Sequence, residues 1–404
     1  MRMKRQGLAL GCAIGLLLAP LAVTGTADAT PNPPAKPVTV MTRNLYLGGD
    51  INRPVEAALR AAAQPDATPE KIVGALAVAT HVTRTIVDQT NFNVRSNLLA
   101  DEISTTEPDL IGLQEVALWR SGPPQPTQVG VPNATHVDYD FLAILLGDLA
   151  ERGEQYVAVS VGNRADVESL SFSATGANPR DVRLTMRDVI LMHVEDGLSV
   201  TGKGDKIYDA NLSFDLPGLP EGTPTIDFDR GYQWVDVRAG AQRFRFVNTH
   251  LEAFSSDLAY AQARQLLAEA TSPNRSTVFV CDCNSDPANN SIKVNIGDTL
   301  PHNAPYRLIT GAGGYTDLWK ASGRPADLPG FDAGDTSGLN ELVNEPLPGS
   351  WTHRIDMVFG RTAGGGPLST DRGQVTGRDG DPRDPATGLW PSDHAGVVMR
   401  VRGL

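Results

Sequence analysis

Short apolar runs of strand length recur along the chain, and several of them lead directly into polar residues. Phe244–Val247 leads into His250, and Thr277–Cys281 leads into Asp282 and Asn284. Apolar runs of this length, bounded by turn-forming residues, are typical of buried β-strands. Polar side chains at strand ends sit on a rigid scaffold and face the open edge of a sheet. The pattern therefore predicts that these side chains meet at a functional site.

Further polar residues along the chain also follow an apolar run or lie within one. Any one of them is also explained as an ordinary turn former, but their recurrence favours a shared function. Asp356 is the least turn-like, because a carboxylate inside an apolar strand is costly to bury without a partner. These residues are Asn44 after Val38–Thr42, Glu115 after Ile111–Gln114, Asp356 within Arg354–Phe359, and Asp393 and His394 after Ser392.

Three segments have helical spacing of apolar residues, namely Asp66–Val87, Asn93–Thr105 and Asp257–Ala270. The last of these lies between the run that ends at His250 and the run that ends at Asp282. This alternation predicts two packed sheets with helices outside. Because the polar motifs extend from end to end with no linker between them, we expect a single domain with loop insertions.

The motifs, taken in order, resemble those of the endonuclease/exonuclease/phosphatase family, which includes pancreatic-type deoxyribonucleases, neutral sphingomyelinases and inositol polyphosphate 5-phosphatases. The resemblance extends from about Val38 to Val401. It implies an α/β fold of the DNase I type, a four-layer α/β/β/α sandwich of two mainly antiparallel sheets flanked by helices. The matching segments are Asn44, Gln114-Glu115, Asn248-Thr249-His250, Asp282-Cys283-Asn284, His353-Arg354-Ile355-Asp356 and Ser392-Asp393-His394.

The resemblance implies a metal-dependent phosphoesterase. It makes Glu115 the principal metal ligand and Asp393 a second or water-mediated ligand, with Asn44 nearby. Hard oxygen ligands of this kind suit Mg²⁺, with Mn²⁺ as the alternative, better than a soft metal. A cation is useful because a phosphate diester has anionic oxygens that repel a nucleophile and a poor leaving group.

Hydrolysis also needs a base for the attacking water, and two assignments remain open. Asp282 takes the proton while Asn284 orients the water, or His394, polarised by Asp356, takes it. His250 is then expected to donate a proton or hydrogen bond to the phosphate or leaving oxygen as an imidazolium. The alternative for His250 is a structural histidine at a strand end.

Two further positions have weaker signals. Asp317 resembles a family segment that leads into a short helix, and its plainer role is a helix cap. Arg187-Asp188 resembles a family strand that supplies a phosphate-contacting group, and a solvated charge pair is the alternative.

The N-terminus has the pattern of a secretory signal peptide. Basic residues precede an apolar stretch from Leu8 to Val23, and Ala27-Asp28-Ala29 offers a small-residue cleavage site. We therefore expect a signal peptide at residues 1–29, a proline-rich disordered spacer at 30–37, a catalytic domain at 38–404, and a secreted protein.

The substrate class is less well defined than the reaction. The formal net charge of −12 argues against strong nonspecific binding to nucleic acid, although a local basic patch would suffice. Nucleic acid, a phospholipid or sphingomyelin headgroup and an inositol phosphate all remain candidates, and a catalytically silent binding protein is the non-enzyme alternative. We expect a monomer. Three long loops are expected to border the crevice: Ser121–Asn133, Pro217–Asp229 and Gly323–Gly349.

Two cysteines would remain after cleavage, Cys281 and Cys283. If both lie on one extended strand, their side chains point to the face opposite Asp282 and Asn284. Residues two apart on one strand rarely reach disulfide geometry. The sequence therefore predicts two free thiols.

Overall fold

The computed structural model describes residues 36–404 apart from 195–196, 216–217, 219–224, 324–333, 346–350 and 379. The signal peptide and most of the spacer predicted at the N-terminus lie outside the described residues. Ala35–Leu404 forms one compact unit. Among the described helices, none combines the length and apolar character needed to cross a membrane.

The first sheet holds the N-terminal and C-terminal strands together. Its order is β15-β16-β1-β2-β6-β3-β4, and β5 also pairs with β6. β1 and β2 are parallel, whereas the other pairs are antiparallel. The bounds are β1 Val38–Asn44, β2 Leu110–Gln114, β3 Leu118–Gly122, β4 His136–Asp140, β5 Tyr156–Ser171, β6 Arg180–His193, β15 Ser369–Thr376 and β16 Gly396–Arg402.

The second sheet has the order β13-β14-β12-β11-β10-β7. Only the β11–β12 pair is parallel, so both large sheets are mainly antiparallel as predicted. A separate two-stranded ribbon pairs β8 with β9. The bounds are β7 Leu198–Ile207, β8 Leu212–Phe214, β9 Ile226–Phe228, β10 Gly231–Ala239, β11 Gln242–His250, β12 Ser276–Asp282, β13 Thr316–Asp317 and β14 Asp356–Arg361.

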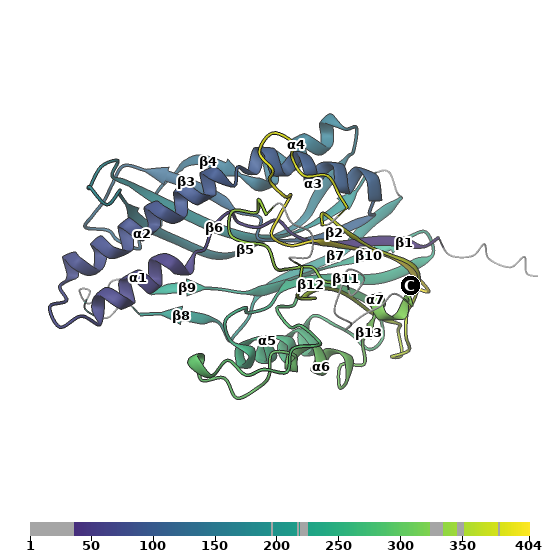
Figure 1. Cartoon of the computed structure of the whole chain (residues 1–404). Helices are drawn as coiled ribbons and strands as arrows, with labels where there is room; N and C mark the ends of the chain where they lie inside the picture. Colours follow the sequence, from purple (N-terminus) through teal and green to yellow (C-terminus); the bar gives the residue numbers. More distant parts are fainter. Residues whose placement is uncertain are drawn as a thin grey trace, which may run out of the picture. The chain divides into compact units, whose positions relative to one another are not determined.

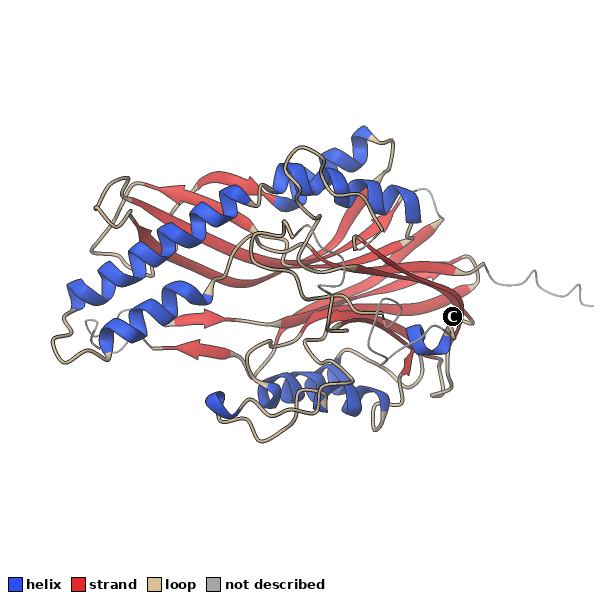
Figure 2. Cartoon of the chain, in the orientation of Figure 1, coloured by secondary structure: helices blue, strands red, loops and turns tan. Residues whose placement is uncertain are grey.

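Helices form the two outer layers, which confirms the predicted four-layer α/β sandwich. α2, α3 and α4 cover the first sheet, and α5 and α6 cover the second (Figures 1 and 2). The three predicted helices agree with α2, α3 and α5 to within a few residues, while α1 and α4 were not predicted. The bounds are α1 Asn52–Ala62, α2 Pro69–Gln89, α3 Phe92–Thr106, α4 Phe141–Glu151, α5 Ser256–Glu269, α6 Ala304–Thr310 and α7 Leu318–Ala321, with a 3₁₀ turn at Val294–Ile296.

The two sheets pack through an apolar core that narrows at Gly112 on β2. A Cβ atom added there would lie 2.3 Å from Val280 Cγ2 and 2.7 Å from Asn248 Oδ1. Asn248 on β11 also reaches across the core, because its Nδ2 donates to the carbonyl oxygen of Leu113 (2.9 Å) and Gln114 Nε2 donates to its Oδ1 (2.7 Å). Asn248 therefore joins the second sheet to the first at the ends of their central strands.

Two of the motif residues occupy different places in their strands from those predicted. Asp356 is the first residue of β14 and does not lie inside it, and His250 is the last residue of β11 and does not follow it. Both residues pair across the sheet with Asp282, since β12 lies between β11 and β14. The register therefore places all three side chains at one edge of the second sheet.

The close approach at Gly112 generates a stability prediction. We expect Gly112→Ala to lower the free energy of unfolding by about 1–3 kcal/mol, because the added methyl group overpacks the core against Val280. Gly147 in α4 is the matched control, since nothing lies within 4 Å of a Cβ there. Gly147→Ala should instead stabilise the protein by about 0.5–1 kcal/mol. Chemical denaturation of the two variants measures both values, and an unaffected Gly112→Ala protein would contradict the close approach.

Candidate catalytic and metal site

The structure brings most of the predicted site residues together where the central strands of both sheets end. Asp282 is the common neighbour. Its Oδ2 accepts a hydrogen bond from Asn44 Nδ2 (3.0 Å) and lies 3.3 Å from His250 Nε2 and 3.8 Å from His394 Nε2. Its Oδ1 accepts from the backbone N–H of Asn284 (3.1 Å). Burial raises the pKa of Asp282 to about 7.

His394 and Asp356 form a buried pair beside Asp282. His394 Nδ1 lies 2.7 Å from Asp356 Oδ2, and the backbone N–H of His394 donates to Ser392 Oγ (3.1 Å). Burial acts to lower the pKa of His394, but the charges of Asp356, Asp282 and Asp393 raise it well above its usual value. The pair therefore carries a protonated imidazole whose Nε2 faces Asp282.

Glu115 and Asp393 form a second acidic group. Burial and the charge of Asp393 raise the pKa of Glu115, and burial raises the pKa of Asp393. Glu115 Oε2 accepts from the backbone N–H of Leu47 (2.9 Å), and Glu115 has φ +56°, a backbone conformation that costs energy outside glycine. In the part of the chain that the structure describes, no Lys, Arg or His side chain forms an ion pair with either carboxylate. Two facing carboxylates of this kind suit a hard divalent cation.

A second group also has the composition of a metal site. Asp282, Asp356 and His394 offer ligand atoms that all lie within 4.8 Å of one another. However, His394 Nδ1 already bonds Asp356, and Asp282 already accepts from Asn44. Glu115 and Asp393 fit the role of metal ligands better, because the one side-chain hydrogen bond from the described residues to their oxygens is the long one from Ser392 Oγ to Asp393 Oδ1 (3.4 Å).

Asn44 was predicted beside the metal, and the structure gives its amide two protein partners. Its Nδ2 donates to Asp282, and its Oδ1 accepts from the backbone N–H of Tyr46 (2.8 Å). Ser392 Oγ donates to the carbonyl oxygen of Asn44 (2.8 Å). In this arrangement Asn44 positions Asp282.

The prediction of two free thiols was wrong, because Cys281 and Cys283 form a disulfide. β12 ends at Asp282, so side chains alternate between the two faces of the strand only as far as that residue. Asn284 has φ +44°, and the chain turns at this point. The two Cα atoms lie 5.0 Å apart, within the usual disulfide range. The bridge spans Asp282, and Asn284 Nδ2 donates to the carbonyl oxygen of Leu251 (3.0 Å), which fixes the turn on its other side.

Arg230 is a site residue that the sequence did not reveal. Its Nη1 lies 2.9 Å from His250 Nδ1, and it is 4% exposed. Its Nε lies 3.8 Å from Glu252 Oε2, an ion pair too long for a hydrogen bond. Burial, followed by the charge of Arg230, lowers the pKa of His250 well below its usual value. His250 is therefore neutral in this arrangement, unlike the imidazolium predicted. Arg230 directly precedes β10, whose first residue, Gly231, pairs with His250.

The weaker sequence signals have mixed outcomes. Asp317 is a helix cap, as predicted, because its Oδ1 accepts from the backbone N–H groups of Trp319 and Lys320. Arg187 and Asp188 are not a solvated charge pair. Both are buried within β6, where Arg187 pairs with Asp140 (2.6 Å) and Asp188 pairs with the buried Arg164 (2.8 Å).

The three predicted crevice loops also differ in their outcomes. The loop at Ser121–Asn133 is hydrogen-bonded to Asp181 at the start of β6. Asp181 is six residues from Arg187, which is about 20 Å along an extended strand. This loop therefore lies away from the end of β6 that is nearer the site. Most of Pro217–Asp229 lies outside the described residues. Within Gly323–Gly349, the described part does border the site, since Ser337 forms a β-bridge with His394.

The fold and the site together define a four-layer α/β protein with an acidic, histidine-containing site at one end of its paired sheets. Solved structures of the endonuclease/exonuclease/phosphatase family are similar to the chain. A family member from Leptotrichia buccalis has 13% identity and a TM-score of 0.49, with 91% of this chain and 100% of that chain covered. One from Beutenbergia cavernae has 19% identity and a TM-score of 0.48, with coverages of 91% and 72%.

A mannosyl-6-phosphatase from Bacteroides thetaiotaomicron is also similar, with 15% identity, a TM-score of 0.45, and coverages of 90% and 99%. Because the TM-scores are below 0.5, these similarities carry no argument about activity. No protein-family model matches the sequence, and no curated protein matches it either.

The disulfide generates a prediction for a chain that begins at Thr30, which contains only Cys281 and Cys283. Unfolded without reductant, this protein should take up no maleimide, whereas prior reduction should allow two additions. Intact-protein mass spectrometry distinguishes the two states. Labelling before reduction would show that the thiols are free, as the strand alternation had predicted.

The contact between Arg230 and His250 generates a second prediction. Removing the cation with Arg230→Met should raise the pKa of His250, although burial, the larger cause, should keep it below the ordinary value. Titration of the histidine ring protons by NMR measures the change. Arg243→Met is the control, because Arg243 is exposed at the other end of β11 from His250. An unchanged His250 titration in Arg230→Met would contradict the assigned contact.

Proposed function

We propose that this protein is a divalent-metal-dependent phosphoesterase of the endonuclease/exonuclease/phosphatase family that hydrolyses phosphodiester bonds. The observation that carries the proposal is the position of Asp282. This carboxylate contacts Asn44 and lies beside both His250 and His394. A separate acidic pair, Glu115 and Asp393, lies at the same site.

Asp282 is the better candidate for the general base. Its pKa of about 7 allows it to exist as a carboxylate and to accept a proton near neutral pH. His394 is less suited, because its Nδ1 bonds Asp356 and its raised pKa keeps the ring protonated. The backbone of Asn284 holds Asp282 in place, which leaves its Oδ2 directed toward the two histidines.

The cationic side of the site suits a phosphate group. His394 is protonated, Arg230 is buried with a long ion pair from its Nε to Glu252 (3.8 Å), and His250 lies between Arg230 and Asp282. An anionic phosphate oxygen would accept the hydrogen bond that Arg230 Nε does not make with the described residues, and neutral His250 would donate a hydrogen bond from its ring. These groups would stabilise the negative charge that develops as water attacks phosphorus.

Glu115 and Asp393 would hold the metal ion, which we propose to be Mg²⁺, with Mn²⁺ as the alternative. When bound, such an ion polarises the phosphate and offsets its charge. The ion would also offset the negative charge of the two carboxylates, whose pKa values are raised by burial.

We further propose that the protein is secreted after cleavage of residues 1–29, because the N-terminal sequence has the charge, apolar stretch and small residues of a signal peptide. We propose a monomer as its working state. Nucleic acid is the first substrate class to test, and a phospholipid or inositol phosphate is the alternative.

Turnover by the purified protein tests the proposal. DNA, RNA, sphingomyelin, an inositol phosphate and bis(p-nitrophenyl) phosphate are supplied with Mg²⁺, alongside His250→Ala and the distant control His136→Ala, which changes an exposed histidine. We expect hydrolysis of at least one ester by the wild type and the control, and a loss of at least about 100-fold in His250→Ala. Inactivity on every ester would refute the proposed function.

The metal assignment generates a separate prediction. Glu115→Gln keeps the size of the side chain but removes its charge, so Mg²⁺ affinity measured by calorimetry should fall at least about tenfold. Glu107→Gln changes an exposed glutamate and should bind Mg²⁺ like the wild type. Excess chelator should abolish turnover, and restored Mg²⁺ should recover it. Equal Mg²⁺ affinity in Glu115→Gln and the wild type would exclude Glu115 as the principal ligand.

A further inference from the structure

An apolar pocket lies beside the site, between helices α1 and α2 and the strands β3, β5, β6 and β9. It encloses about 530 Å³, including its open mouth. Its lining residues are Ile51, Pro54, Val55, Leu76, Thr80, Thr83, Trp119, Val167, Glu168, Ser169, Val182, Leu184, Ile226 and Phe228.

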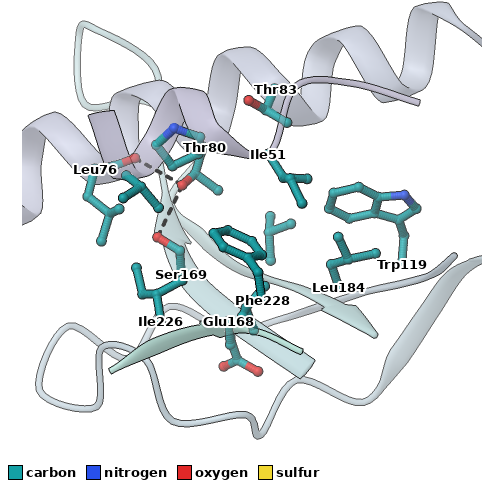
Figure 3. A pocket seen from close by; sticks show the side chains of 14 residues that line it. Ile51, Leu76, Thr80, Thr83, Trp119, Glu168, Ser169, Leu184, Ile226 and Phe228 are labelled. Atoms are coloured by element: carbon teal, nitrogen blue, oxygen red, sulfur yellow. Dashed lines mark hydrogen bonds between the residues drawn. The ribbon is translucent and has the colours of Figure 1, made fainter. Parts of the chain in front are cut away.

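The few polar groups of the lining have partners in the protein. Thr80 Oγ1 donates to the carbonyl oxygen of Leu76 (2.9 Å) and lies 3.1 Å from Ser169 Oγ, as the dashed lines in Figure 3 show. Thr83 Oγ1 donates to the carbonyl oxygen of Asp50 (2.9 Å). The carboxylate of Glu168 points away from the apolar side chains and accepts from two backbone N–H groups (Figure 3).

The consequence is a pocket wall that presents hydrocarbon and few hydrogen-bonding atoms. A nucleobase would lose its hydrogen bonds to water on entering such a pocket and gain few in return. A flexible aliphatic chain has no such groups, and each methylene that it buries is favourable. The lining therefore selects an aliphatic chain over a base.

Three short connections place this pocket next to the candidate site. Trp119 Nε1 donates to the carbonyl oxygen of Leu47 (2.8 Å), and the N–H of that same residue donates to Glu115 (2.9 Å). Phe228 is two residues from Arg230, which contacts His250.

Leu184, also in the lining, is two residues from Met186 on β6, so the two side chains lie on one face of the strand about 7 Å apart. The sulfur of Met186 lies 3.9 Å from Arg230 Nη1. Two residues of the pocket wall, Phe228 and Leu184, are thus two residues in sequence from Arg230 and from its contact Met186.

We infer that this pocket binds an aliphatic chain carried by the phosphate ester, so that the substrate is an alkyl or acyl phosphodiester of the lipid type. The inference rests on the proposed function, because it assigns the substrate class of the same site. In the reaction, water gives a proton to Asp282 as its oxygen bonds to phosphorus, and the bond from phosphorus to the leaving oxygen breaks with its electron pair on that oxygen. The products are the alcohol or alkoxide that leaves and a phosphate monoester that keeps the chain.

Alkyl p-nitrophenyl phosphates with methyl, butyl and octyl chains test the inference, since release of p-nitrophenolate reports each turnover. We expect KM to fall with chain length by up to about fourfold per added methylene until the pocket is filled. Equal KM values for the three esters would overturn the inference while leaving the phosphoesterase proposal intact.

Two phenylalanine variants on β5 separate the pocket from general effects. Val167→Phe fills the pocket and should raise KM for the octyl ester at least tenfold, while kcat/KM for the methyl ester stays within twofold of the wild type. Val157→Phe is the control, because Val157 lies on the same strand, is 42% exposed and does not line the pocket. An equal change for both esters in Val167→Phe would count against a chain-binding pocket.

A binding measurement keeps the two proposals distinguishable if no ester is hydrolysed. Calorimetry with methylphosphonate and octylphosphonate should show tighter binding of the octyl compound by the wild type and loss of that difference in Val167→Phe. Chain-length-dependent binding without hydrolysis would support the pocket and refute the phosphoesterase. Equal binding of both phosphonates would refute the pocket.

Discussion

The close approach of the two sheets at Gly112 and Asn248 is the constraint on which the site depends. Gly112 leaves no room for a side chain, and Asn248 bonds backbone and side-chain groups of β2 across the core. These contacts hold the end of β2 against the end of β11. Because Glu115 follows one strand and His250 ends the other, these contacts bring Glu115 and His250 to the same end of the paired sheets.

Burial of several ionisable groups gives the site its electrostatic character. Asp282 and Glu115 have raised pKa values, His394 is held protonated by its acidic neighbours, and His250 is held neutral by burial and Arg230. In water the two histidines would share one pKa, and the carboxylates would be ionised. Here their surroundings shift the pKa values apart, so the site holds an acid, a base and a neutral hydrogen-bond donor, as hydrolysis of a phosphate ester requires. The disulfide and the turn at Asn284 keep Asp282 at the centre of this arrangement.

The residues that would select the substrate come from two helices and from strands of the first sheet. α1, the middle of α2, and β9 line the apolar pocket together with β3, β5 and β6, and none of the lining residues supplies a charged group to the site. The strand ends therefore provide the chemistry, and the pocket provides the shape that meets the rest of the substrate. This division explains why the motifs predicted the reaction more closely than the substrate.

The sequence by itself determined the layers and most of the site, because strand periodicity and polar strand ends are local properties of the chain. It could not determine the pairing of Arg187 with Asp140 or the contact of Arg230 with His250, since each joins residues distant in sequence through the sheet register. It also missed the disulfide, because alternation assumes an extended strand and the chain turns after Asp282. The protonation of each histidine, likewise, is decided by burial and neighbouring charge, which only the tertiary structure supplies.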